Sequence, residues 1–247
     1  MNKKDFNLIR SLGKKKTRSE RKLFVVEGIK SILELIGSDF EIQKLLLTRE
    51  TLAEHRDAFE PVRKLISAVD EGELAKASSL EFNNTGIAIV KQKKESPLEI
   101  KDTDLVVMLD DIRDPGNLGT IIRTADWYGV SKIICSTSTA DFYNSKAVAA
   151  SMGSFTRMDV YYTDLPKVLK EVTTPVIAAM LDGMDAHTFE YPESGILLIG
   201  NEANGISAPV LPFVTHAISI PSYGNAESLN AALATGILLD NWKRNLA

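Results

Sequence analysis

The sequence predicts an α/β protein built from two successive domains. Apolar, strand-like runs alternate with helical stretches along most of the 247 residues, which is the pattern of helices packed on sheets. Two of these runs, 105–109 and 195–200, are continuously apolar, as buried parallel strands are. The stretch 91–104 is charged and without periodicity, which is typical of a linker. We therefore expect a small N-terminal α/β domain, a linker and a C-terminal α/β domain, at 1–95, 96–104 and 105–247.

Charge is divided unevenly between the two halves. Residues 1–101 carry 20 Lys+Arg and 16 Asp+Glu, whereas residues 102–247 carry 9 and 17. A basic half and an acidic half are expected to have different functions. Cys135 is the only cysteine, which excludes an intrachain disulfide and a thiolate metal cluster, and we expect it in the core. No apolar run approaches the roughly 18–20 residues of a membrane span, so we expect no membrane partner and a cytoplasmic location.

A basic cluster lies near the N-terminus. Its six cations fall within nine residues, enough to neutralise several phosphates: Lys14, Lys15, Lys16, Arg18, Arg21 and Lys22. A solvated helix and loop would have the same composition. The cluster nevertheless favours RNA binding by the N-terminal domain.

The rest of this half alternates strand and helix. We expect strands at 23–26, 42–47, 62–69 and 86–90, with helices at 29–36, 49–59 and 70–77. No pattern here indicates catalysis. His55 stands among charged residues and is expected at the surface.

In the C-terminal half, three polar clusters follow predicted strands, at 110–123, 200–205 and 221–230. Ligands of doubly wound α/β domains bind at the carboxyl ends of strands, so these clusters mark the candidate site. The glycine patterns of Rossmann and P-loop nucleotide sites are both missing from the sequence.

The first cluster leads into a predicted helix. Asn117 is expected to cap it, and Arg123 lies off its apolar face, where it can serve a ligand or pair with Asp126. In the second cluster, Glu202 alone would more often cap a helix than act in catalysis.

The third cluster is a polar loop between a strand and a helix. The strand breaks at Pro221, and the helix is expected to begin near Ser228 with Leu229 on its apolar face. Such a loop can direct main-chain N–H and C=O groups at a ligand.

Together and in this order, the clusters resemble the signature of the SpoU (TrmH) family of RNA ribose 2′-O-methyltransferases. The three runs are DPGNLGTIIRTADWYG (114–129), GNEANGIS (200–207) and IPSYGNAESLN (220–230). The N-terminal half is similar to the substrate-binding domain that precedes many of these enzymes, with KLFVVEG and NTGIAIV as weaker hallmarks. Departures are mild: Thr120 and Ser222 replace an alanine and a methionine, and no polar motif residue is lost.

The resemblance implies a C-terminal domain with a trefoil knot, one of the exceptions to the rule that chains do not thread loops. It also implies S-adenosylmethionine as cofactor, held largely by main-chain groups at Gly200, Asn201, Ile220 and Leu229. A side chain at Gly200 is expected to intrude where backbone meets ligand. Homodimers through the C-terminal domain are implied as well. Small Ala232 and Gly236 would let the last helix approach a partner closely, although packing within one chain would use them equally.

The same resemblance assigns catalytic roles. Arg123 would bind the phosphate beside the target ribose and lower the pKa of its hydroxyl; an arginine is a poor base, but proton removal by Arg123 stays open. Asn117 and Asn230 would hold Arg123 and the ribose, Glu202 would orient the arginine, and Ser228 would fix the loop. The expected substrate is ribosomal RNA. Transfer RNA, or a catalytically silent RNA-binding factor, are the alternatives.

Overall fold

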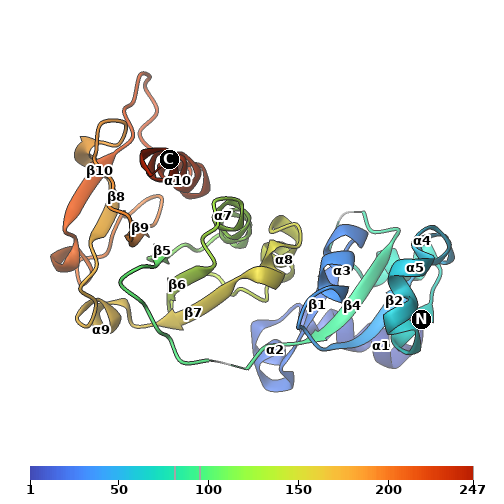
Figure 1. Cartoon of the computed structure of the whole chain (residues 1–247). Coiled ribbons are helices and arrows are strands. Elements are labelled where there is room, and N and C mark those ends of the chain that lie inside the picture. The colour runs from blue at the N-terminus through green and yellow to red at the C-terminus, as the bar shows by residue number, and fades with distance from the viewer. Residues whose placement is uncertain (81, 95, 247) are drawn as a thin grey trace. The chain divides into compact units, whose positions relative to one another are not determined.

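The computed structural model describes residues 1–80, 82–94 and 96–246, and the chain divides into two compact units (Figure 1). Unit 1 comprises Met1–Lys94 and Asp141–Thr156, and unit 2 comprises Glu95–Ala140 and Arg157–Ala247. The domain boundaries expected from sequence stay a prediction. Within the described residues, no helix is long and apolar enough to cross a membrane.

Unit 1 contains a four-stranded mixed sheet in the order β1-β4-β2-β3. Strand β4 is antiparallel to β1 and β2, and β2 is parallel to β3. Its elements are α1 (Lys3–Leu12), α2 (Lys15–Arg21), β1 (Leu23–Glu27), α3 (Ile29–Ile36), β2 (Ile42–Leu47), α4 (Arg49–Glu54), α5 (Arg56–Phe59), η1 (Glu60–Leu65), β3 (Ile66–Ala68), α6 (Glu71–Ala77), β4 (Gly86–Lys91), α8 (Ser145–Ala150) and η2 (Ser154–Arg157).

Two predicted elements of this unit are wrong in detail. The helix expected over 49–59 is interrupted at His55, which joins α4 to α5 with φ −115°. The strand expected over 62–69 is only Ile66–Ala68, because a 3₁₀ helix occupies Glu60–Leu65. Pro61 in the first turn of that helix favours a helical start just before the expected strand, since a helix start tolerates a missing N–H and Pro has a φ suited to it.

The two faces of this sheet are covered differently, because side chains alternate along a strand. Leu23 and Val25 belong to the core shared with α1 and α6. Phe24 belongs to an aromatic cluster with Phe40 and two residues from far along the chain, Tyr143 and Phe155. Fully buried Phe155 makes the 141–156 segment an integral part of unit 1.

Unit 2 contains a six-stranded sheet in the order β10-β8-β9-β5-β6-β7, and all its neighbouring strands are parallel. The chain builds outward from β5 to β7 and then crosses back to the other side, so β5 and β9 mark the point where the strand order reverses (Figure 1). Its elements are β5 (Leu105–Leu109), α7 (Pro115–Trp127), β6 (Lys132–Ser136), β7 (Asp159–Thr163), α9 (Leu165–Leu169), β8 (Val176–Asp185), β9 (Gly195–Ile199), η3 (Leu211–Phe213), β10 (His216–Ser219) and α10 (Ala231–Asn245).

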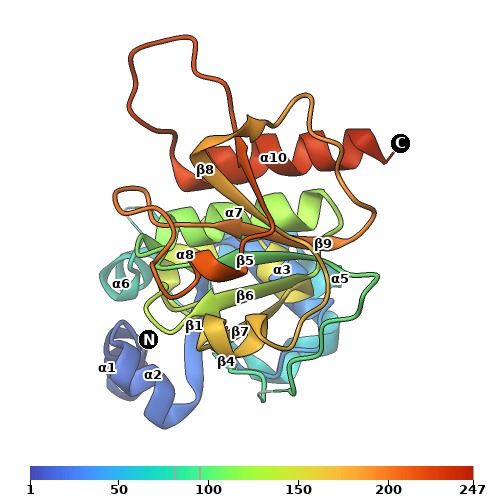
Figure 2. The ribbon, with the colours of Figure 1, turned by 90° about the vertical axis from the view of Figure 1, so that its left-hand side faces the viewer.

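The central strands of unit 2 are buried on both faces, as their continuous hydrophobicity predicts. Val106 and Met108 pack on the face that α9 covers. Helices α7 and α10 pack against each other (Figure 2), and fully buried Trp242 of α10 donates its indole N–H to Pro192 O at 2.8 Å. Cys135 is fully buried, which confirms its place in the core, and burial raises the pKa of its thiol.

Candidate active site

The polar segments that follow β5 and β9 are bonded to each other at the point where the strand order reverses. Buried Asp110, directly after β5, accepts a hydrogen bond at its carboxylate from the main-chain N–H of Ser207 at 2.8 Å. The side-chain amide of Asn201 donates to the carbonyl of Asp111 at 2.9 Å. The first and second sequence clusters therefore form one rigid edge of the sheet.

Residues 200–205, hereafter the glycine loop, close on themselves. Asn201 and Gly205 exchange two main-chain hydrogen bonds, at 2.9 and 2.8 Å, and Gly205 has φ +64°. A Cβ added to Gly200 would lie 2.4 Å from Gly205 C and 2.5 Å from its carbonyl oxygen. Glycine at 200 is therefore required by the loop itself, because a side chain there would meet main-chain atoms of Gly205.

One chain of side-chain hydrogen bonds joins all three sequence clusters. Asn117 donates its amide to Glu202 Oε1 at 2.5 Å and accepts at its oxygen from the amide of Asn230 at 2.9 Å. The expectation that Asn117 caps α7 is wrong: Asp114 is the cap and accepts from the main-chain N–H of Asn117, which lies in the first turn and so keeps its side chain for other partners. Asn230 caps α10. The structure thereby brings together three of the five residues predicted to be catalytic.

Arg123 lies on the exposed side of α7. It is six residues beyond Asn117, about 9 Å along the helix axis at 1.5 Å per residue. Among the described residues it has no hydrogen bond or ion pair; Glu202 bonds Asn117 instead, and Asp126 bonds Arg157. The guanidinium is therefore free to meet a ligand.

The segment 220–230, hereafter the final loop, stands away from the sheet between β10 and α10 (Figure 2). Helix α10 begins at Ala231, so the expected start near Ser228 is wrong by one turn, because the Asn230 side chain accepts from Ala232 N and Leu233 N and caps the helix there. Ser228 is exposed. Leu229, expected on the apolar face of the helix, instead precedes the helix and is 41% exposed. Within the final loop, no main-chain N–H from Ile220 to Leu229 has a partner in the described part of the chain.

Of the six cations predicted to contact RNA, five are exposed in unit 1 and one is not. Arg18 has a side-chain exposure of 3%, pairs with Asp141 at 2.5 Å and donates to the carbonyl oxygens of Leu12 and Gly13. The prediction for Arg18 is corrected accordingly: its guanidinium fastens α2 to the 141–156 segment. Charge counting could not separate it from its neighbours.

Sequence reasoning missed two features of this site. The sequence analysis did not distinguish Asp110 from the other acidic residues of its cluster. A carboxylate directly after a buried strand is itself buried, and it therefore needs a hydrogen-bond partner. Gly183, inside β8, would place a Cβ 2.5 Å from Ile218 C. The signal was available, because an isolated glycine in a strand often marks close approach of another backbone.

Comparisons with known proteins point to one family for unit 2 and a related module for unit 1. Residues 104–240 match the SpoU rRNA Methylase family, and residues 5–88 match the MRM3-like substrate binding domain.

Similarity to individual proteins extends over nearly the whole chain. This chain is 30% identical over 239 residues to the 23S rRNA (guanosine(2553)-2′-O)-methyltransferase RlmP of Bacillus subtilis, and the match covers 93% of this chain and 92% of that protein. It is 27% identical over 257 residues to the 23S rRNA (uridine(2479)-2′-O)-methyltransferase of Streptomyces viridochromogenes, covering 96% and 88%. The crystal structure of an AdoMet-bound rRNA methyltransferase from Sinorhizobium meliloti superposes with a TM-score of 0.87 at 31% identity, covering 99% of this chain and 96% of that one.

Proposed function

Because this chain belongs to the SpoU rRNA methylase family, we propose that it transfers a methyl group from S-adenosylmethionine to a ribose 2′-hydroxyl of ribosomal RNA. The observation that carries the proposal is the hydrogen-bonded chain Glu202–Asn117–Asn230, which joins the three family motifs on the helix that carries Arg123, an arginine with no ion pair among the described residues. A protein that kept only the fold would have no need of this polar arrangement.

In the proposed reaction, the 2′-oxygen attacks the methyl carbon in line with the departing sulfur. An O–C bond forms, the C–S bond breaks, and the hydroxyl proton is released. Bound S-adenosylmethionine would supply a methyl already activated by the sulfonium charge. The protein must therefore orient the hydroxyl and favour loss of its proton.

Arg123 is proposed to serve the acceptor. Its exposed guanidinium would bind the phosphate beside the target ribose and stabilise negative charge developing on the 2′-oxygen. Asn117 and Asn230 would hold the ribose, and Glu202 would fix the orientation of the Asn117 amide, because the bond between them leaves that amide one arrangement. Ser228 is proposed to steady the final loop.

The chemistry of the glycine loop and the final loop fits the cofactor. The main-chain N–H groups of the final loop from Ile220 to Leu229, Pro221 apart, have no partner within the described residues, and Asn201 of the closed glycine loop bonds Asp111. A ligand rich in hydrogen-bonding groups would satisfy these groups on binding. We propose that Gly200, Asn201, Ile220 and Leu229 hold S-adenosylmethionine, within a trefoil knot formed by this part of unit 2.

Unit 1 is proposed to bind the RNA through Lys14, Lys15, Lys16, Arg21 and Lys22, which are all exposed. Its match to a substrate-binding module supports this division, and named relatives that act on 23S rRNA favour ribosomal over transfer RNA. An rRNA substrate also supports a cytoplasmic location. Since the two relatives modify a guanosine and a uridine, the target nucleotide does not follow from similarity.

We also propose a homodimer through α7 and α10. These helices border a groove of about 660 Å³, and Trp127 and Leu233 on them are 83% and 54% exposed. A second copy of the chain is the proposed occupant, as the family resemblance implies. Gly236 supports this less directly than its small size suggests, because its position faces Thr124 of the same chain, 3.6 Å from an added Cβ.

The reaction is tested on large-subunit rRNA transcribed in vitro, which carries no prior modification. Incubation with the protein and S-adenosylmethionine should make one linkage resistant to alkali, since a methylated 2′-oxygen cannot attack the adjacent phosphate. Arg123→Ala should abolish this protection and leave S-adenosylmethionine affinity within about twofold, because the lost interaction belongs to the acceptor and the transition state.

Arg157→Ala is the matched control, since Arg157 is an exposed arginine of unit 2 already paired with Asp126. It should retain full protection. A methylated product that alkali still cleaves at the modified nucleotide would show that a base is the target. Failure of the protein to bind S-adenosylmethionine would instead favour a silent RNA-binding factor.

A further inference from the structure

The loop between β5 and α7 presents a second arginine, outside the residues assigned above. Arg113 has a side-chain exposure of 71% and forms a two-point pair with Asp111: Nε donates to Oδ1 at 3.0 Å, and Nη2 lies 3.0 Å from Oδ2. A guanidinium has five N–H donors, and Asp111 occupies two. The remaining three are open to a ligand, since the side chain is mostly exposed and the pair holds the guanidinium in one plane.

The main chain of Asp111 is itself held by two hydrogen bonds in an unusual conformation. Its main-chain N–H donates to Ser136 Oγ at 2.9 Å, its carbonyl accepts from the Asn201 amide at 2.9 Å, and its φ is +62°. That conformation is uncommon for a residue with a side chain, and such outliers gather at functional sites. The bond from Arg113 lowers the pKa of the Asp111 carboxyl from its ordinary value. Asp111 therefore ties Arg113 to the glycine loop.

The charge around this edge of the sheet makes Arg113 distinctive. Four segments follow the carboxyl ends of β5, β6, β9 and β10, at 110–114, 137–140, 200–210 and 220–230. Their sequences contain one Lys or Arg, Arg113, against five carboxylates: Asp110, Asp111, Asp114, Glu202 and Glu227. An RNA strand that reaches this edge brings further negative charge, and Arg123 on α7 is the other cation of unit 2 proposed to contact it.

A stabilising role for the fold does not account for the arrangement. The Arg113 side chain is 71% exposed and that of Asp111 is 17% exposed, and an ion pair with one partner so open to solvent adds little to stability, because water and salt screen it. A short loop would also be less strained without a positive φ at Asp111. Presentation of a guanidinium in one orientation does account for both, because phosphate recognition by arginine depends on a fixed fork of donors.

We propose that Arg113 binds a backbone phosphate of the RNA strand that carries the target ribose, at a different phosphate from Arg123, and that Asp111 positions it. This rests on the proposed function. The Arg113–Asp111 pair would fix the register of the bound RNA strand, so that the target ribose lies next to the cofactor.

The test compares Arg113→Gln, Arg113→Lys and Asp111→Asn with the wild type, using unmodified large-subunit rRNA transcript. Arg157→Gln is the matched control, because it also removes an arginine from an exposed Arg–Asp pair of unit 2, ahead of the amino end of β7. Steady-state kcat and KM for RNA, S-adenosylmethionine affinity, melting temperature, and the salt dependence of RNA binding are measured for each.

Arg113→Gln should raise KM for RNA about tenfold with kcat within about twofold, and lessen the slope of log K against log salt by about 0.7–0.9, the value for one phosphate. Arg113→Lys should leave the salt slope unchanged and raise KM less than Arg113→Gln does, because lysine keeps the positive charge but lacks the planar fork of donors. Asp111→Asn should keep the slope and raise KM severalfold. Arg157→Gln should change none of these.

The proposal is overturned if Arg113→Gln matches Arg157→Gln in KM and salt slope. It is also overturned if Arg113→Gln lowers melting temperature and cofactor affinity together, because the arginine would then support the loop instead of the RNA. Absence of ribose methylation by the wild type would refute the proposed function alone, and the salt slopes would still decide whether Arg113 contacts the RNA.

Discussion

Replacing Gly200 by alanine is the sharpest test of the glycine loop. The added Cβ would lie 2.4 Å from Gly205 C, 2.5 Å from Gly205 O and 2.7 Å from Ile206 N. These are main-chain atoms, so no side-chain rotation relieves the clash, and the two bonds between Asn201 and Gly205 must lengthen or break. Two hydrogen bonds contribute about 1 kcal/mol each, and the backbone shift adds about 1–2 kcal/mol.

The resulting sum of about 3–4 kcal/mol corresponds to about a 150-fold to nearly 1,000-fold weaker affinity for a ligand that requires the closed loop. Isothermal titration of S-adenosylmethionine measures it directly. Gly72→Ala is the control, because Gly72 lies in α6 with no heavy atom within 4 Å of an added Cβ and no positive φ. Cofactor affinity of Gly200→Ala within threefold of the wild type would refute the reasoning, since the loop would then tolerate a side chain or play no part in binding.

Two further predictions concern charged residues. The double variant Lys15→Gln, Lys16→Gln should weaken RNA binding and reduce its salt dependence without lowering the melting temperature. Arg18→Gln should lower the melting temperature by several degrees, because it leaves buried acceptors unpaired. Equal melting curves for the two variants would contradict this. The hydrogen bond from Lys132 at 2.6 Å lowers the pKa of Asp104 from its ordinary 3.8. The stabilisation that this bond gives the folded protein is therefore complete above pH 3.8, and it is lost as pH falls toward the pKa of Asp104 in the folded state. Asp104→Asn should therefore cost stability in urea unfolding at pH 7 and much less at pH 3, and an equal cost at both values would count against the pair.

The sequence was most informative about elements that hydrophobic periodicity defines. The buried strands Leu105–Leu109 and Gly195–Ile199 were predicted from continuous apolar runs, and α7 was predicted from a 3.6-residue repeat, although its cap is Asp114 and not Asn117. The start of α10 was missed by one turn, since Asn230 is as good a cap as Ser228 and the sequence does not rank them.

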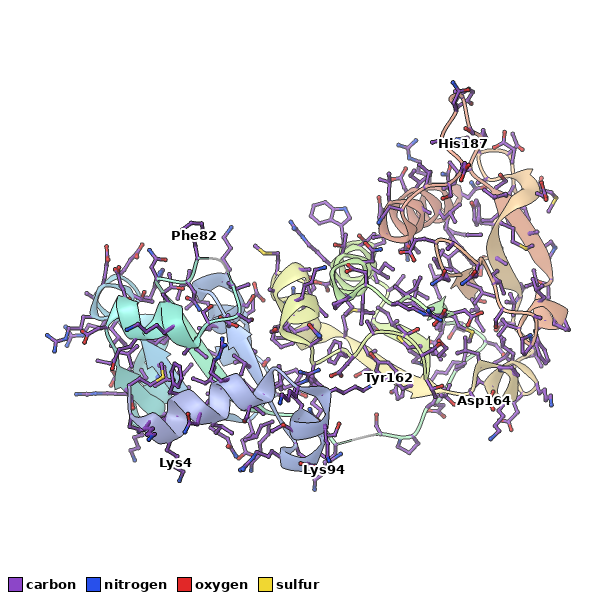
Figure 3. All side chains as sticks on the ribbon, turned by 180° about the vertical axis from the view of Figure 1, so that it is seen from behind. Lys4, Phe82, Lys94, Tyr162, Asp164 and His187 are labelled. Atoms are coloured by element: carbon purple, nitrogen blue, oxygen red, sulfur yellow. The ribbon has the colours of Figure 1, made fainter. Side chains whose placement is uncertain are left out.

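Pairing between distant side chains was beyond sequence reasoning. That Glu202, Asn117 and Asn230 share one site followed from their motifs, but the order of their bonds did not, and the expected contact between Glu202 and Arg123 has no counterpart among the described residues. Arg18 and Lys15 look alike in a count of charges, and only the fold distinguishes a buried guanidinium from an exposed ammonium group. Phe82, exposed at 87% in unit 1 (Figure 3), was likewise not singled out.

The contribution of Phe155 and Tyr143 to the core of unit 1 has a consequence for synthesis on the ribosome. The strands of unit 1 are complete at Lys91, but Phe24 and Phe40 lack their aromatic partners until residues 141–156 have been made. At about 5–20 residues per second, that interval lasts several seconds. During it the nascent chain exposes an apolar face that chaperones recognise, so truncated forms ending near residue 100 should aggregate during expression, and the N-terminal unit should mature only after much of the second has emerged.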